Sequence, residues 1–359
     1  MKPFLLAGGG TGGHISPALA VAEALENRLG WSVSIHFAAT HRPVDRRMYA
    51  GMGERVHFLD PPRIDRGPAG LLRFPFGAAR TWFATRRMIR RISPGAILCT
   101  GGYSSVFCAA AGGSMGIPVL IHESNAVAGR ANMCSARFAS RILLGFGRAS
   151  RDFPGGRTGL VGNPVRRSLS PIPRTEAVAR LGLDPGRPVV LLLGGSQGAR
   201  TVNDLALSAP AGIQLVLQCG ERDLERIGGL LSGRDGTVVR AFEDDPSALY
   251  SCATVAVARA GAMTLAELCR FRLPGLLVPL PDVSRDHQSA NAREAEASGG
   301  ALVFAQEGLD PAEFWSGVEQ LLADRRTLES MSEGMAGLFP ADAADRIAEA
   351  LITASGAPA

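Results

Sequence analysis

The chain of 359 residues carries a formal net charge of +5, with 46% hydrophobic and 20% charged residues. This composition excludes an intrinsically disordered chain, and the length favours two domains over a single hydrophobic core. The charge is divided unevenly, because residues 1–163 hold 20 basic and 8 acidic residues, a net charge of +12, whereas residues 164–359 hold 18 and 25, a net charge of −7.

Strands alternate with helices along both halves, which predicts an α/β protein with two parallel sheets in doubly wound, Rossmann-like domains. The expected strands are 4–7, 33–38, 96–99, 119–122 and 141–144 in the first half, and 189–193, 214–218, 237–240, 255–258, 275–278 and 301–304 in the second. Prolines between residues 158 and 173 indicate a linker, so we place the domains at 1–162 and 163–340. A last helix, 341–355, is expected to pack back on the first domain. We expect neither a signal peptide nor a membrane-spanning helix, because the apolar stretches are short or broken by glycine and proline.

A glycine-rich turn follows the first strand of each half, at residues 8–14 and 194–199. Glycines between a strand and a helix expose backbone N–H groups at the positive end of the helix dipole, an arrangement suited to phosphate. Ligands of open α/β sheets bind outside the carboxyl ends of the strands. We therefore expect two phosphate-binding turns that face each other across a cleft.

The first turn formally matches the dinucleotide-binding fingerprint, which also requires an acidic residue at the end of the second strand for the ribose diol. Here the first carboxylate is Asp45, so a nicotinamide cofactor is disfavoured, although His41 and Arg42 leave room for a 2′-phosphate. His14 ends the turn. Its imidazole is suited to act as a base near neutral pH, and a structural hydrogen-bonding role is the alternative.

The segment 71–92 combines six arginines with large apolar side chains. On a helix one side is apolar and carries Ala78, Trp82, Met88, Ile89 and Ile92. The nearly opposite side is basic and carries Arg80, Arg87 and Arg91. This pattern is typical of a basic helix on an anionic bilayer surface, and also of a solvated helix whose apolar side packs in the core. The pattern alone favours the second interpretation, and no nucleic-acid-binding motif accompanies it.

A further helix start lies at residues 259–267, after the strand 255–258. Thr264 and Glu267 have the spacing of a capping box, in which both side chains bind backbone N–H groups. Alternatively, the N–H groups of Met263 and Thr264 bind a phosphate, and Glu267 accepts hydrogen bonds from a ribose diol. The nucleotide would then bind the C-terminal domain.

Polar side chains gather again after the strand 275–278, where Gln288 and Asn291 follow Asp286. Amides donate and accept hydrogen bonds and so suit sugar hydroxyls, whereas helix capping by Asp286 is the structural alternative. The six cysteines form no CxxC pair, and the six histidines lack metal-ligand spacing. We therefore expect no disulfide, no metal and no cofactor.

Seven motifs stand in a fixed order along the chain, at residues 9–14 with 17–20, 100–103, 122–125 with Gly129, 162–166, 194–200, 261–267 and 286–292. Together they resemble the lipid-intermediate N-acetylglucosaminyltransferases of peptidoglycan synthesis, which are GT-B glycosyltransferases of family 28. The resemblance covers roughly residues 4 to 305. The chain departs from the family pattern at Leu217, where a histidine is usual, and at 39–45, which lacks the usual Gly-Thr and following Glu.

The resemblance implies a two-domain GT-B fold and inverting transfer of N-acetylglucosamine from UDP-N-acetylglucosamine (UDP-GlcNAc). The acceptor would be the 4-hydroxyl of undecaprenyl-pyrophosphoryl-N-acetylmuramoyl-pentapeptide. A peripheral place on the cytoplasmic face of the bacterial inner membrane is implied as well, with proteins of cell-wall synthesis as further partners. This implication shifts our interpretation of segment 71–92 toward docking on an anionic membrane surface. Neither nucleic acid nor a cofactor is implied.

Carried over position by position, the resemblance assigns contacts with UDP-GlcNAc to Thr11, Gly12, Gly13, Asn125, Arg166, Ser196 and Gln288. The donor phosphates and ribose would be held by Ala262, Met263, Thr264, Leu265, Ala266 and Glu267. The main chain of Glu243 would bind uracil. The candidate base is His14, and the first glycine turn would face the acceptor pyrophosphate. Ser196, Arg166 and helix N-termini would stabilise the leaving diphosphate without a metal.

Three alternatives remain open on the sequence. Another GT-B enzyme, such as a glycolipid glycosyltransferase or a UDP-GlcNAc epimerase, would share the donor site. A non-catalytic nucleotide-sugar binder would bind the donor and release no UDP. An NADP oxidoreductase is the most remote of the three.

Overall fold

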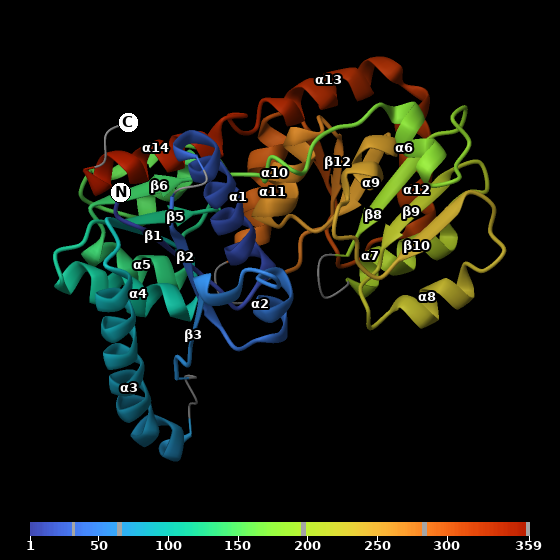
Figure 1. The fold of residues 1–359 in the computed structure, drawn as a ribbon. Helices are drawn as coiled ribbons and strands as arrows, with labels where there is room; N and C mark the ends of the chain where they lie inside the picture. The colour runs from blue at the N-terminus through green and yellow to red at the C-terminus, as the bar shows by residue number, and fades with distance from the viewer. Residues whose placement is uncertain (31–32, 63–66, 195–198, 282–285, 357–359) are drawn as a thin grey trace. The chain divides into compact units, whose positions relative to one another are not determined.

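The computed structural model describes residues 1–30, 33–62, 67–194, 199–281 and 286–356, and the chain divides into two compact units (Figure 1). The first unit comprises Met1–Arg167 with Asp342–Ala359, and the second comprises Ser168–Ala341. The boundary expected after residue 162 lies a few residues before this division. The C-terminal helix α14 (Ala343–Ser355) groups with the first unit and begins two residues after its predicted start.

The first unit is built on a seven-stranded parallel sheet with the strand order β3-β2-β1-β4-β5-β6-β7. Its strands are β1 (Phe4–Gly8), β2 (Ile35–Thr40), β3 (Val56–Leu59), β4 (Ala96–Gly101), β5 (Val119–Glu123), β6 (Arg141–Leu144) and β7 (Thr158–Leu160). The helices that accompany α14 are α1 (Gly12–Leu29), α2 (Pro43–Met48), α3 (Pro68–Ile92), α4 (Tyr103–Ser114) and α5 (Arg130–Ser135). Short 3-10 turns lie at Gly53–Arg55, Ala136–Phe138 and Gly147–Asp152.

The core of this unit lies on both faces of its sheet. Successive side chains of a strand point to opposite faces, so β1 contributes to two layers. Phe4 and Leu6 pack in a cluster with α1 and α14. Leu5 and Ala7 pack in another with α3 and α4. Helices on both faces of a parallel sheet are the doubly wound arrangement that the sequence predicts.

The second unit is built on a six-stranded parallel sheet with the order β10-β9-β8-β11-β12-β13. Its strands are β8 (Val189–Leu193), β9 (Gln214–Gln218), β10 (Thr237–Arg240), β11 (Val255–Ala258), β12 (Gly275–Leu277) and β13 (Ala301–Val303). Its helices are α6 (Arg174–Arg180), α7 (Arg200–Leu205), α8 (Leu224–Leu230), α9 (Ser247–Cys252), α10 (Ala262–Arg270), α11 (His287–Ala297), α12 (Pro311–Ala323) and α13 (Arg325–Ala336), and Ala206–Ser208 forms a 3-10 turn. The fully buried alternate residues Val190 and Leu192 of β8 pack in a cluster with Trp315 of α12.

Two strands are missing from the sequence prediction. Both β3 and β7 lie at the edges of the first sheet, and their residues are largely half-exposed, so neither has a buried apolar run. The linker predicted from residue 158 is therefore wrong at its start, because Thr158–Leu160 pairs with β6. Helix α3 also begins at Pro68 and runs through Pro75, whereas the predicted segment begins at residue 71.

Candidate active site

The first glycine turn is anchored from α2 and the residues beside it. Asp45 is fully buried and accepts the N–H of Gly10 at 2.9 Å. The hydroxyl of Tyr49 donates to the carbonyl of Gly8 at 2.8 Å, and Arg42 Nη1 donates to the carbonyl of Gly10 at 3.1 Å. The turn between β1 and α1 is thus held through both its N–H and its carbonyl groups.

Asp45 is a supporting residue of the site that the sequence analysis did not identify. In the sequence, Asp45 is the first acidic residue after the second strand, and it lies beyond the position expected of a ribose-binding acid. In the fold its carboxylate also accepts the N–H of Thr40 at 2.8 Å, so it connects the end of β2 to the glycine turn. A carboxylate that accepts buried backbone N–H groups holds them with charge-assisted hydrogen bonds.

His14 stands in the first turn of α1, where its ring meets two glycines. A Cβ on Gly101 would lie 2.6 Å from ring Cδ2, and Gly101 and Gly102 have φ of 117° and 85°, a conformation that suits glycine. The ring Nδ1 lies 3.3 Å from the carbonyl of Gly9 and 3.2 Å from Thr11 Oγ1. The tautomer that donates Nδ1–H to this carbonyl leaves Nε2 with a lone pair.

Burial lowers the pKa of His14 below the ordinary value of 6.5, and the hydrogen bond to the Gly9 carbonyl opposes this shift only in part. The imidazole is therefore neutral near pH 7, which is the form that can accept a proton. The position, tautomer and neutral state of His14 all suit a general base.

A pocket of about 500 Å³ opens beside His14 within the first unit. Its wall is formed by both glycine segments and by the residues that follow β2 and β3: Gly9, Gly10, Thr11, His14, Thr40, His41, Arg42, Pro43, Leu59, Asp60, Pro61, Pro62, Gly102 and Tyr103. The N-termini of α1 and α4 both reach this pocket, and Arg42 adds a positive charge, which are features that favour an anion. Asp60 adds one negative charge to the wall and lies 3.4 Å from His41 Nε2.

Asn125 lies on the loop after β5 and is held by the buried carboxylate of Glu123. Oε1 of Glu123 accepts from the backbone N and from Nδ2 of Asn125, at 2.9 and 3.1 Å. Oε2 accepts from the N–H of Gly129 at 2.8 Å and from Asn132 Nδ2 at 2.9 Å. Arg166 follows β7 and belongs to the first unit, although the sequence placed it in the second domain.

In the second unit, α10 begins at Ala262, with Gly261 as its N-cap and with no side-chain capping bond. Thr264 thus lies inside the first turn, and the capping-box interpretation of this helix start is wrong. The N–H groups of Ala262, Met263 and Thr264 have no intrahelical acceptor, as is general for a first helical turn. The N–H of Leu265 already donates to the carbonyl of Gly261 at 3.0 Å.

The side chains in the first turns of α10 differ in their exposure to solvent. Those of Leu265 and Ala266 are buried in the core, so a ligand at the end of the helix could reach only their backbone. Glu267 is half-buried and accepts a hydrogen bond from the hydroxyl of Tyr250 at 2.5 Å. Tyr250 is a neighbour that the sequence did not predict, because it lies on a different helix and matches no motif.

Gln288 and Asn291 support neighbouring backbone. Oε1 of Gln288 accepts the N–H of Leu280 at 2.9 Å. Asn291 is fully buried and its Nδ2 donates to the carbonyl of Ala260, just before α10. Asp286 is the N-cap of α11, with no side-chain capping bond, so its proposed capping role is not realised.

Two predicted donor contacts remain. The N–H of Glu243 donates to Gln218 Oε1 at 3.2 Å, so this amide is already engaged. Ser196 lies in the segment 195–198, outside the described residues. Within the described ranges, no group of three or more His, Cys, Asp or Glu residues is arranged to hold a metal ion.

Two family models match the chain: the glycosyltransferase family 28 N-terminal domain at residues 4–144 and the family 28 C-terminal domain at residues 189–347. A curated relative from Halorhodospira halophila is 37% identical over 356 residues, which cover 97% of each chain. It is named UDP-N-acetylglucosamine--N-acetylmuramyl-(pentapeptide) pyrophosphoryl-undecaprenol N-acetylglucosamine transferase. The equally named protein of Solidesulfovibrio magneticus is 35% identical over 367 residues, 98% of each chain.

Solved structures agree in fold. MurG from Acinetobacter baumannii superposes with a TM-score of 0.74 and 26% identity, over 98% of this chain and 100% of that one. The UDP-GlcNAc 2-epimerase of Neisseria meningitidis, bound to UDP-GlcNAc, covers 98% of this chain and 100% of its own, with a TM-score of 0.67 and 13% identity. This second likeness concerns the fold alone. Together with the two parallel-sheet units, the matches confirm the predicted GT-B fold.

Proposed function

The chain belongs to glycosyltransferase family 28, and we propose that it transfers N-acetylglucosamine from UDP-GlcNAc to N-acetylmuramyl-(pentapeptide) pyrophosphoryl-undecaprenol in peptidoglycan synthesis. The observation that carries this proposal is the 35 to 37% identity over nearly the full chain to enzymes with that name. An epimerase shares the fold, but the structural likeness to one has only 13% identity.

In the transfer, the acceptor hydroxyl attacks the anomeric carbon of the donor sugar as the bond to the diphosphate breaks. His14 Nε2 takes the hydroxyl proton, and the electron pair of the broken bond leaves with UDP. Attack opposite to the leaving group inverts the anomeric centre. Base catalysis of this kind typically contributes about 10²- to 10⁴-fold in rate.

The nucleotide binds at the start of α10. The N–H groups of Ala262, Met263 and Thr264 meet the diphosphate, where the helix dipole also favours its charge. Glu267 accepts hydrogen bonds from the ribose hydroxyls. Because the Glu243 N–H is engaged by Gln218, its carbonyl is the main-chain group that remains for uracil N3–H. Arg166, Ser196, Asn125 and Gln288 complete the donor contacts.

The acceptor pyrophosphate occupies the pocket beside His14. The supporting features are the two helix N-termini, Arg42 and the neutral imidazole at its edge. Thr11 lines this pocket at the start of α1, and Thr11, Gly12 and Gly13 would contact the donor sugar during transfer.

The membrane-docking element is α3, whose predicted basic side, with Arg80, Arg87 and Arg91, is exposed and has beside it an apolar stripe that the sequence did not predict. Met88 and Ile92 are buried in the core, as an apolar side requires. The outer side carries an exposed apolar stripe, with Leu72, Phe76 and Phe83 at 73%, 75% and 69% exposure. These three positions share one side of a helix at 100° per residue. Among the described residues, no helix is long and apolar enough to cross a membrane.

Exposed arginines flank this stripe, including Arg73, Arg80 and Arg87, in the unit that holds most of the positive charge. Apolar side chains that enter the interface and arginines that meet anionic headgroups are the two components of interfacial binding. The enzyme would thereby sit as a peripheral protein on the cytoplasmic face of the bacterial membrane, where the lipid-linked acceptor lies.

The docking test is co-sedimentation with phosphatidylglycerol vesicles. Arg80→Glu with Arg87→Glu should weaken binding by more than about tenfold, since each basic residue near an anionic surface contributes about 1 kcal/mol. The matched control, Arg141→Glu with Arg151→Glu, changes the charge of the same unit equally outside α3. An equal loss of vesicle binding in both double variants would mean that net charge alone drives binding. Unchanged vesicle binding in the α3 double variant would reject α3 as the docking element.

The test of the transferase function is UDP release from UDP-GlcNAc with and without the lipid-linked muramyl acceptor. Acceptor-dependent UDP release, with the sugar recovered on the lipid, is expected. Conversion of the donor to an epimer without acceptor would identify an epimerase. Donor binding with no UDP release under either condition would identify a nucleotide-sugar binder.

A further inference from the structure

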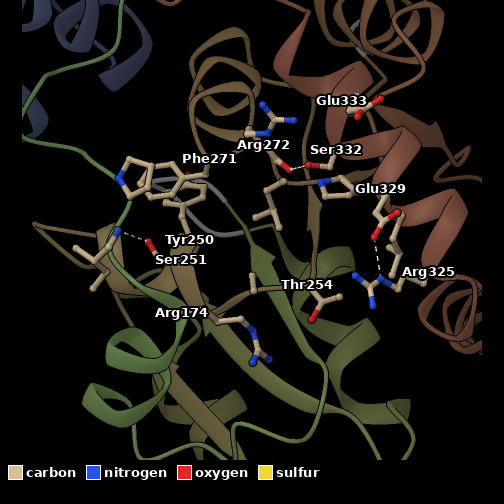
Figure 2. Close-up of a pocket in the computed structure, with 16 residues that line it drawn as sticks. Arg174, Tyr250, Ser251, Thr254, Phe271, Arg272, Arg325, Glu329, Ser332 and Glu333 are labelled. Carbon is tan, nitrogen blue, oxygen red and sulfur yellow. Dashed lines mark hydrogen bonds and ion pairs between the residues drawn. The ribbon is translucent and has the colours of Figure 1, made fainter.

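Tyr250 is buried in the second unit and contacts Glu267, the candidate ribose-binding residue. It lies near the end of α9 with 4% of its surface exposed, and its ring stacks on Phe271 with 5.0 Å between centroids and 25° between planes. Its hydroxyl reaches Glu267 Oε2 at 2.5 Å. Figure 2 shows Tyr250 and Phe271 side by side in the lining of a pocket, together with Ser251. This pocket has a volume of about 540 Å³. The backbone N–H of Ile172 donates to Ser251 Oγ at 3.1 Å.

The direction of this hydrogen bond is fixed by chemistry. Burial, and secondarily the charge of Glu267, raise the pKa of Tyr250 well above its ordinary value, so the phenol stays protonated. An ionised carboxylate can only accept, so toward ionised Glu267 the protonated phenol is the donor. The ring cannot turn away easily, because Phe271 stacks against it.

The hydrogen bond to Oε2 also affects the second carboxylate oxygen of Glu267, Oε1. A glutamate has three rotatable bonds, and holding it for a ligand costs side-chain entropy at the moment of binding. A donor that fixes Oε2 removes much of this cost in advance and sets the direction in which Oε1 points. Carboxylate recognition of two adjacent hydroxyls depends on that direction.

We infer that Tyr250 is a positioning residue for nucleotide binding: its hydroxyl orients the Glu267 carboxylate toward the ribose diol of UDP. This inference rests on the proposed function, which gives Glu267 its ribose role. Tyr250 acts through Glu267 and needs no contact with the nucleotide.

The test is the dissociation constant of UDP, measured by calorimetry for Tyr250→Phe. This change keeps the ring and its stacking and removes one hydroxyl. UDP affinity should fall about three- to tenfold, less than the loss of a direct hydrogen bond to a charged group would cost, because Tyr250 acts only through Glu267. The fitted stoichiometry reports the folded fraction, so the affinity refers to folded protein. Ser251→Ala, the matched control, removes the hydroxyl of the adjacent residue, whose partner is Ile172, and should leave UDP affinity within twofold, roughly the additivity error of independent sites.

Two further measurements separate positioning from a general structural effect. In a Glu267→Ala background, Tyr250→Phe should cause no additional loss of UDP affinity. With 2′,3′-dideoxy-UDP as ligand, wild type and Tyr250→Phe should bind alike, because the hydroxyls that Glu267 would accept are absent. A full additional loss in the double variant, or an equal loss with the dideoxy ligand, would overturn the inference.

The outcomes also distinguish the inference from the proposed function. If Glu267→Ala weakens UDP binding while Tyr250→Phe does not, only the positioning role of Tyr250 is refuted. If Glu267→Ala leaves UDP affinity unchanged, the ribose assignment fails, and the inference fails with it. If the wild-type chain does not bind UDP, the proposed function itself is refuted.

Discussion

The starts of α1 and α10 are two versions of one strand–turn–helix unit, and they differ in how a nearby carboxylate is used. Asp45 is fully buried, and its carboxylate accepts hydrogen bonds from the backbone N–H groups of Gly10 and Thr40. Glu267 is half-buried, and a tyrosine hydroxyl holds its Oε2. The first carboxylate builds the turn, whereas the second is placed to serve a ligand. The role of an acid beside such a helix start therefore depends on its exposure and on whether backbone or a side chain holds it.

The largest effect should follow from His14→Ala, which removes the proton acceptor from the first helix start. We expect kcat to fall by about 10²- to 10⁴-fold. UDP affinity should stay within a few-fold, because the nucleotide binds at the other helix start. Steady-state UDP release and calorimetry measure the two quantities. An unchanged kcat would show that His14 is not the base, and that the two helix starts do not differ in this chemical role.

Glu267→Ala tests the second helix start. Loss of a charged acceptor for the ribose hydroxyls should weaken UDP binding by about 1 to 3 kcal/mol. The measurement is calorimetric titration with UDP, and Glu294→Ala on α11 serves as a carboxylate control in the same unit. Equal UDP affinity in Glu267→Ala and the parent chain would mean that both carboxylates are structural.

Asp45→Asn tests whether the first carboxylate builds the turn. An amide in place of one oxygen would direct an N–H donor at the backbone N–H of Gly10 or Thr40, so unfolding free energy should fall by about 1 to 3 kcal/mol. Urea denaturation measures it. Asp60→Asn alters an exposed carboxylate of the same unit and should change stability by less than about 0.5 kcal/mol. Comparable stability of Asp45→Asn and Asp60→Asn would contradict the anchoring role.

The pH profile gives the smallest expected effect. Because burial lowers the pKa of His14, its base form persists as the pH falls to 6.5, the ordinary value for histidine. The acidic limb of kcat/KM should therefore have its midpoint below pH 6.5, with activity lost as His14 becomes protonated. A midpoint above pH 6.5 would contradict the lowered pKa of His14 and with it a neutral base at the first helix start.

The sequence predicts most of the fold because buried strands of parallel sheets are continuous apolar runs. The strands at 141–144, 189–193 and 255–258 have the predicted bounds. The edge strands β3 and β7 escaped prediction since half-exposed strands lack such a run. Motif order indicated the family, which the full-length matches confirm.

The supporting contacts of the site were not predictable from the sequence. Asp45 lies 35 residues from Gly10 in the chain, and Tyr250 lies 17 residues from Glu267 on another helix. No local pattern signals such pairs, because each depends on how separate elements pack. The exposed stripe of α3 was missed for a related reason: the sequence pattern did not show that Phe76 and Phe83 lie outside the core.

The most direct test of the difference between the two helix starts is the rate of UDP release against UDP-GlcNAc concentration, for His14→Ala and Glu267→Ala side by side with saturating lipid acceptor. We predict that a high donor concentration restores most of the wild-type rate in Glu267→Ala, and that no donor concentration restores it in His14→Ala. Rescue of His14→Ala by donor, or a rate in Glu267→Ala that stays low at saturation, would contradict the account.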